Sequence, residues 1–250
     1  MRVAICQPTY LPWLGYFDLI DQVDTFVLLD TVQFERQSWQ QRNRIKTPAG
    51  LQWLTVPVLF RGKLDQKICD VEIRTADFVE KHARALEVNY SRAHYFKSFF
   101  PALSSILRGI QPGARLSELN VSLLQWLMSI LKINTPFMLA SSMNEAGRRT
   151  GLLANICRRL GAGDYLSPIG SAEYLLSELA LMNEANIETH FQHYVHPGYE
   201  QRFPPFIPYA SIVDLVFNEG DRAMEIIRSG RRTPLTPVQV AANVAEVRER

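Results

Sequence analysis

Residues 30–46 bring together the carboxylate of Asp30, a cluster of cations and the aromatic ring of Trp39. Asp30 follows a short apolar run, and a carboxylate there can act as a general base, hold a metal ion or bind a sugar hydroxyl. Guanidinium and ammonium groups bind phosphate or carboxylate, and four of them fall within eleven residues: Arg36, Arg42, Arg44 and Lys46. We expect an anion-binding site here. The alternatives are a solvated basic loop and, for Asp30, a helix cap or a surface ion pair.

The expected roles at this site follow from the side-chain types. Asp30 serves as base or hydroxyl ligand, and Arg42 and Lys46 serve as anion clamps, with Arg42 and Asp30 as the catalytic pair. The other ligand contacts that we expect from this segment are Gln33, Trp39, Asn43 and Lys46.

The turn at residues 7–16 is the second candidate site. It follows an apolar run at residues 3–6 and leads into a helix over residues 17–20. A strand, a tight turn and a helix in this order bind ligands in α/β proteins, at the carboxyl end of the strand and beside free helix N–H groups. The ligand contacts that we expect here are Gln7, Tyr10, Trp13, Gly15 and Tyr16. The alternative is that the rings belong to the core and that Gly15 only permits close helix packing.

A second strand–turn–helix pattern lies at residues 165–174. Ser167 ends the strand, Gly170 lies in the turn and Ser171 precedes the helix, so free N–H groups there could hold a phosphate. Helix capping by Ser171 alone explains the pattern equally well. The segment lacks the Gly-x-Ser-x-Gly motif of a nucleophile elbow, so we do not expect a nucleophilic serine.

Three histidines follow one another at intervals of three residues: His190, His193 and His196. In a strand, His190 and His193 point to opposite faces, so the spacing disfavours joint coordination and we predict no metal site. His196 begins a proline-rich loop and is the expected acid or base. Tyr199 and Gln201 are expected to line the same pocket.

These candidate sites need a scaffold of alternating strands and helices. Apolar runs predict strands at residues 3–6 and 25–29, which form a right-handed parallel βαβ unit with the helix between them. Further strands are predicted at residues 51–59, 67–74, 137–140, 165–167 and 187–194, with a turn at Arg61-Gly62-Lys63. Helices are predicted at residues 77–90, 117–132 with Ser117 as N-cap, 151–160, 175–185, 211–218 and 222–229.

The order of these elements predicts a Rossmann-like α/β fold, with a mostly parallel sheet and a helical middle segment over about residues 76–132. We expect one domain over residues 1–230, and a C-terminal tail or peripheral helix over residues 231–250. Asp214 falls among apolar residues of a predicted helix, where a buried carboxylate needs a partner. We therefore expect a structural role for Asp214.

Composition excludes several classes of protein. The 250 residues carry a formal net charge of +2, which gives no case for a general nucleic-acid binder. The three cysteines are far apart and form no CxxC pair, as expected of reduced thiols rather than disulfides or a zinc site. We see no signal peptide and no apolar run near the ~18 residues of a membrane span, so we expect a cytoplasmic protein. No motif predicts a cofactor or an oligomeric state.

Longer motifs follow one another along the chain. They lie at residues 7–16 (QPTYLPWLGY), 30–34 (DTVQF), 42–45 (RNRI), 165–170 (YLSPIG), 196–201 (HPGYEQ) and 211–220 (SIVDLVFNEG). In these segments, which span residues 1 to about 225, the chain resembles the WbqC-like protein family of bacteria. That family is associated with gene clusters for O-antigen and other surface polysaccharides. The resemblance implies a transferase acting on a nucleotide-activated sugar or a related small, anionic metabolite.

The first motif is also distantly similar to the opening of nucleotidyltransferases of the HUP type, in which Gln-Pro is followed by His-x-Gly-His and a helix. Trp13 and Tyr16 occupy the histidine positions, and residues 167–171 lie where a phosphate turn would be. This similarity implies a nucleotide pocket without the groups that stabilise a transferring phosphate. The alternative function is therefore a catalytically degenerate nucleotide-binding scaffold. A nucleic-acid module built on residues 36–46 is a third hypothesis, which the near-neutral charge disfavours.

Overall fold

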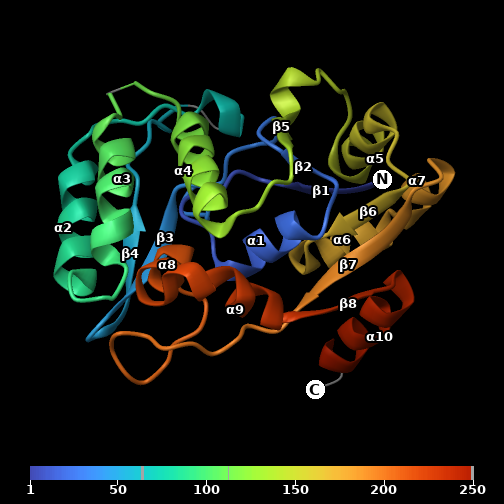
Figure 1. Cartoon of the computed structure of the whole chain (residues 1–250). Helices are drawn as coiled ribbons and strands as arrows, with labels where there is room; N and C mark the ends of the chain where they lie inside the picture. Colours follow the sequence, from blue (N-terminus) through green and yellow to red (C-terminus); the bar gives the residue numbers. More distant parts are fainter. Residues whose placement is uncertain (63–64, 112, 249–250) are drawn as a thin grey trace.

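The computed structural model describes residues 1–62, 65–111 and 113–248 (Figure 1). Within that part of the chain, six strands form one sheet in the order β5-β2-β1-β6-β7-β8. Its parallel strands are β1 (Arg2–Cys6), β2 (Thr25–Leu28), β5 (Phe137–Leu139), β6 (Asp164–Ser167) and β7 (Glu188–Tyr194). The last strand, β8 (Arg231–Leu235), pairs antiparallel with β7. The predicted α/β fold with a mostly parallel sheet is confirmed.

The first elements form the βαβ unit that the apolar runs predict. β1 pairs in parallel with β2, with Val3 opposite Thr25, and α1 (Leu14–Asp21) connects the two strands. Side chains alternate between the faces of a strand, so Ala4 packs in the hydrophobic cluster that contains α1 and Val3 packs in the cluster on the opposite face. β1 ends at Cys6, and the polar residues that follow therefore lie at the carboxyl edge of the sheet.

Helices cover both faces of the sheet (Figure 1). One face packs against α1, α8 (Ile212–Glu219) and α9 (Ala223–Ser229). The other packs against α5 (Arg149–Leu160), α6 (Ala172–Ser177), α7 (Leu179–Glu184) and α10 (Pro237–Arg248). Short 3-10 helices are η1 (Ile68–Asp70), η2 (Ala140–Ser142), η3 (Ile169–Ser171) and η4 (Gly220–Arg222). None of the helices in the described part of the chain combines the length and the apolarity needed for a membrane crossing.

The helical middle segment is also confirmed. It contains α2 (Phe78–Tyr90), α3 (Phe96–Arg108) and α4 (Leu116–Leu131), beside a hairpin of β3 (Arg42–Thr47) and β4 (Gly50–Thr55) (Figure 1). The N-cap of α4 is Arg115, whose backbone N–H donates to the Glu118 carboxylate over 3.2 Å, so the prediction of Ser117 as N-cap is wrong. Strand β3 falls in a stretch that the sequence did not predict as a strand.

Residues 67–74 are the clearest correction, because they form η1 and isolated bridges rather than a strand. Ile68, Val71 and Ile73 are fully buried, which explains the strand-like apolar pattern. Their backbone groups, however, pair with loops: Ile73 N donates to the Ala114 carbonyl, and the Val71 carbonyl accepts from Leu116 N. Lys63, in the turn predicted at residues 61–63, lies outside the described residues.

Residues 231–235, expected to begin a tail or a peripheral helix, instead extend the sheet as β8, and α10 follows them. A partly buried ion pair joins β8 to α1, since Nε of the partly exposed Arg231 lies 2.7 Å from Oδ1 of the fully buried Asp18. Gln192 donates to Asp18 Oδ2 and to the Gly15 carbonyl oxygen, over 2.8 Å in each case. Burial raises the pKa of Asp18 in spite of these partners.

Candidate functional site

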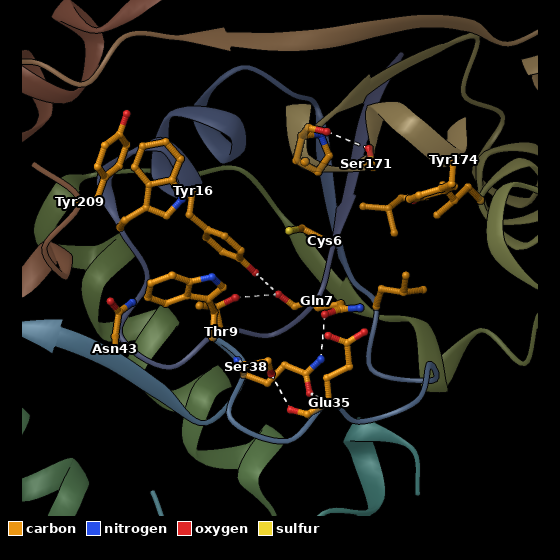
Figure 2. Close-up of a pocket in the computed structure, with 18 of the residues that line it drawn as sticks. Cys6, Gln7, Thr9, Tyr16, Glu35, Ser38, Asn43, Ser171, Tyr174 and Tyr209 are labelled. Carbon is orange, nitrogen blue, oxygen red and sulfur yellow. Dashed lines mark hydrogen bonds between the residues drawn. The ribbon is translucent and has the colours of Figure 1, made fainter. Parts of the chain in front are cut away.

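A cavity of about 610 Å³ lies at the carboxyl edge of the sheet (Figure 2). The chain leaves β1 toward β2 and β5 on one side and later returns to β6 on the other, so a topological switch point lies between β1 and β6. Ligands of open α/β sheets bind in the crevice outside the strand ends at such a point. Cys6 and Gln7 reach the cavity from the end of β1, and Ser171 reaches it from the segment after β6. The cavity thus occupies the position that this topology offers to a ligand.

The lining combines apolar surface with a limited set of polar groups, as small-molecule sites do. Its aromatic rings are Trp13, Tyr16, Trp39, Tyr174 and Tyr209. Its polar and charged side chains are Gln7, Thr9, Glu35, Ser38, Gln40, Asn43, Arg44 and Ser171. The remaining lining residues are Ile5, Cys6, Leu29, Leu153, Pro168 and Gly170. In Figure 2 Cys6, Gln7 and Tyr16 lie in the middle of the lining, with Ser171 and Tyr174 on one side of them and Ser38 and Glu35 on the other.

The turn after β1 is closed by hydrogen bonds to Gln7. The Tyr16 hydroxyl donates to the Gln7 carbonyl oxygen over 3.0 Å, and Gln40 Nε2 donates to Gln7 Oε1 over 2.8 Å (Figure 2). Gly15 leaves room for the Trp13 ring, because a Cβ at this position would lie 2.3 Å from that ring. Gln7, Trp13 and Tyr16 therefore line the cavity together, whereas Gly15 supports Trp13 from outside the lining.

Tyr10 belongs to the core rather than to the cavity. Its side chain is fully buried, and its hydroxyl lies 2.8 Å from His82 Nδ1. Burial lowers the pKa of His82 to about 4, so the ring is neutral at pH 7 and shares a hydrogen bond with the Tyr10 hydroxyl. Asn43 Nδ2 donates to the Leu11 carbonyl oxygen over 2.8 Å and so ties β3 to the turn. Asn43 and Trp39 both line the cavity.

Asp30 lies just past β2 and outside the cavity lining. It is buried, its Oδ1 accepts from the Ser141 backbone N–H over 2.8 Å, and its Oδ2 accepts from the Ser141 hydroxyl over 2.6 Å. The carboxylate therefore joins the ends of β2 and β5. Gln33 forms an isolated β-bridge with Lys67, also outside the lining.

Tyr199 and Gln201 bind Asp214 rather than line the cavity, and the charge of Lys46 acts on the same carboxylate. Three side chains donate to the fully buried Asp214 carboxylate over 2.7–2.9 Å: Tyr90, Tyr199 and Gln201. Lys46 Nζ donates to the Pro205 carbonyl oxygen over 2.6 Å. Burial raises the pKa of Asp214 and lowers the pKa of Lys46. This cluster fastens the loop at residues 195–210 to the hairpin and to α8.

His196 lies behind the rings that line the cavity. Its ring stacks on Trp13 with 6.2 Å between centroids and packs against Tyr209 at 5.0 Å. Nδ1 donates to the Pro197 carbonyl oxygen over 2.9 Å. Burial lowers the pKa of His196, which favours the neutral ring.

The segment after β6 contributes Gly170 and Ser171 to the lining, while Ser167 lies behind them. The hydroxyls of Ser167 and Ser171 are hydrogen-bonded to each other, and Ser171 Oγ donates to the Pro168 carbonyl oxygen over 2.8 Å. Both serines are thus engaged within the turn.

Arg42 also lies outside the lining, with its guanidinium carbon 4.2 Å from the centroid of the Trp53 ring. The sequence did not single out as ligand contacts several residues that line the cavity: Glu35, Gln40, Tyr174 and Tyr209. Arg44, one of the four cations of the predicted anion site, also lines the cavity. Tyr209 depends on a loop that returns from far along the chain, for which no local pattern gives a signal.

The titratable groups of the cavity limit its chemistry. Burial raises the pKa of Cys6 to about 12, so this thiol stays protonated at neutral pH and is a poor nucleophile. Among residues 1–62, 65–111 and 113–248, no three His, Cys, Asp or Glu side chains are grouped in a way that could hold a metal ion.

Comparison with known proteins places the chain in a family. Residues 7–226 match the WbqC-like protein family. The chain is 39% identical over 232 residues to "Uncharacterized protein Rv1507c" of Mycobacterium tuberculosis (strain ATCC 25618 / H37Rv), and this alignment covers 92% of the chain and 99% of that protein. No solved structure matches the chain significantly. The match over residues 7–226 includes the turn after β1, the hairpin and the segment after β6, and on this basis the chain belongs to the WbqC-like protein family.

Proposed function

We propose that this protein is a transferase that acts on a nucleotide-activated sugar, or a related anionic metabolite, in surface-polysaccharide biosynthesis in the cytoplasm. The observation that carries the proposal is the cavity at the switch point between β1 and β6. Its aromatic rings offer faces on which a base or a sugar can stack, and Arg44 offers planar donors for a phosphate. Its volume of about 610 Å³ suits a small molecule.

Glu35 is the candidate general base, because it supplies the carboxylate among the described residues that line the cavity. It would accept the proton of an acceptor hydroxyl or amine that attacks the anomeric carbon of the sugar. The bond from that carbon to the phosphate oxygen breaks, and Arg44 stabilises the negative charge on the leaving nucleoside diphosphate. Asp30 and His196 then position other residues instead of contacting the ligand. Asp30 holds Ser141, and His196 supports the Trp13 ring.

The test is calorimetric titration with uridine, guanosine and thymidine diphosphate sugars, followed by mass spectrometry of the products. We expect binding to at least one of them. Glu35→Gln should retain binding and lose transfer, whereas Glu184→Gln, at an exposed position on α7, should retain both. A folded protein that binds none of these compounds would contradict the proposal.

The second candidate is a nucleotide-binding scaffold without catalysis. The observation that favours it concerns the two positions at which the similar nucleotidyltransferases carry histidines. Here the Trp13 ring lies against Gly15, and the Tyr16 hydroxyl is bound to the Gln7 carbonyl oxygen. Saturable binding of a nucleotide sugar without product formation, unchanged in Glu35→Gln, would favour this candidate over the transferase.

A further inference from the structure

Two guanidinium groups beside the cavity stack on tryptophan rings. The guanidinium carbon of Arg42 lies 4.2 Å from the Trp53 centroid, and that of Arg44 lies 5.3 Å from Trp39 and 5.4 Å from Trp53. The two indole rings are themselves 5.3 Å apart. We call these four side chains, Arg42, Arg44, Trp39 and Trp53, the stacked row.

The hairpin explains why these groups meet. Arg44 lies opposite Trp53 in the register of β3 and β4, and Arg42, two residues earlier, lies on the same face. Trp39 and Trp53 are 48% and 42% exposed, so the row faces solvent. Stacking holds each guanidinium flat, which preorganises its fork of donors for a planar or tetrahedral anion.

Neither arginine has a carboxylate partner within the described part of the chain. Nε of each is buried and has no hydrogen-bond partner among those residues. Arg44 donates one long bond, of 3.5 Å, to the Tyr209 carbonyl oxygen. Because no carboxylate of the described residues neutralises either guanidinium, an anion at this place would supply a counter-charge and accept hydrogen bonds from the outer Nη donors.

The distribution of charge in the cavity indicates how the ligand is oriented when bound. Arg44 is the one cation among the described lining residues, and it lies with Trp39 in the stacked row. The carboxyl ends of β1 and β2 contribute the uncharged side chains of Ile5, Cys6 and Leu29, and burial keeps Cys6 a neutral thiol. A charged phosphate is therefore stabilised at the row and not beside these strand ends.

We infer that the stacked row is the phosphate subsite of the ligand: a diphosphate binds Arg42 and Arg44, and an uncharged ring joined to it enters the cavity. The identity of the ring rests on the proposed function. The binding of a diphosphate rests on the stacked row alone. The other end of the ligand lies over the exposed faces of Trp39 and Trp53.

Inorganic pyrophosphate is the probe that tests the subsite without a sugar or a base. We expect it to change tryptophan emission and to bind more weakly as salt concentration rises. Arg42→Gln and Arg44→Gln should each raise Kd at least about tenfold, because each removes charge-assisted hydrogen bonds. Arg202→Gln is the matched control: Arg202 is also stacked, 5.2 Å over Phe203, with a buried Nε lacking a partner, and it lies outside the cavity lining. The Kd of pyrophosphate for the Arg202→Gln variant should differ from that of the wild type by less than about twofold.

Further measurements separate this inference from the proposed function. Thermal denaturation establishes that the variants fold, and Arg44→Lys, which keeps the charge but not the planar fork, should show a smaller loss than Arg44→Gln. Absence of pyrophosphate binding to the wild type, or equal Kd in all variants, overturns the subsite. If a uridine diphosphate sugar binds equally well without either arginine, the subsite is wrong and the proposed function stands. If pyrophosphate requires both arginines but no nucleotide sugar binds, the subsite stands and the proposed function fails.

Discussion

Ser141 holds both oxygens of the Asp30 carboxylate, one through its backbone N–H at 2.8 Å and the other through its hydroxyl at 2.6 Å. The two residues follow neighbouring parallel strands, β2 and β5, at the same edge of the sheet. A hydrogen bond to a charged group contributes about 1.5–3 kcal/mol to stability. The pair therefore locks the end of β2 beside the end of β5.

We predict that Ser141→Ala lowers the free energy of unfolding by about 1–3 kcal/mol, because Asp30 Oδ2 loses its donor while remaining buried. Urea denaturation monitored by circular dichroism measures this. Ser142→Ala is the control, since that exposed hydroxyl bonds only the Leu139 carbonyl oxygen. Equal losses of unfolding free energy in the two variants would show that the hydrogen bond to Asp30 stabilises the fold no more than an exposed one.

Gly15→Ala should destabilise the protein by about 1–3 kcal/mol, the usual cost of forcing an extra methyl group into packed surroundings. The added Cβ would lie 2.3 Å from the Trp13 ring, which must then move within the cavity wall. Denaturation and tryptophan fluorescence report the two consequences. Gly163→Ala, where a Cβ meets nothing within 4 Å, should change neither measurement.

The buried His82 should make stability depend on pH. Its pKa is about 4 in the folded chain and near 6.5 when unfolded, so the unfolded chain binds more protons between these values. The contribution of the neutral His82 ring to the free energy of unfolding is fully present above pH 6.5. It is lost as the pH falls toward 4, which lowers the free energy of unfolding by about 3 kcal/mol. His82→Gln should flatten the curve of unfolding free energy in this window, whereas His94→Gln, at an exposed position, should leave its slope as in the wild type.

Arg231→Gln should cost about 3 kcal/mol of stability, because it leaves the fully buried Asp18 carboxylate without its cation. Adding Asp18→Asn should recover part of this loss, since it removes the unpaired charge. Arg108→Gln, which breaks an exposed pair with Glu80, should leave unfolding nearly unchanged. If Arg231→Gln and Arg108→Gln lowered the free energy of unfolding by similar amounts, the burial of Asp18 would not be the reason for the loss.

The sequence was most informative where elements bury apolar side chains in a simple local pattern. Residues 3–6 and 25–29 are such runs, and β1 and β2 form there. β3 escaped prediction because it buries a polar side chain on each face, Asn43 on one and Lys46 on the other, whose acceptors are the carbonyl oxygens of Leu11 and Pro205. No periodicity identifies a strand that buries polar groups against partners so far along the chain.

The candidate site was predictable in part for the same reason. Gln7, Trp13 and Tyr16 reach the cavity because a turn directly after a parallel strand must lie at the carboxyl edge of the sheet. Asp30 follows the lining residue Leu29 and His196 packs on Trp13, but neither lines the cavity, because the direction of a side chain depends on tertiary partners, which here are Ser141 and Trp13.

Strand β8 also determines how the sheet ends. An edge strand presents open backbone groups that can pair with a strand of another molecule. β8 has the sequence Arg-Arg-Thr-Pro-Leu, in which Arg232 is exposed and Pro234 has no N–H to donate. A charged, proline-interrupted strand therefore closes this side of the sheet, and molecules that collide there at high concentration find no ladder of hydrogen bonds to extend.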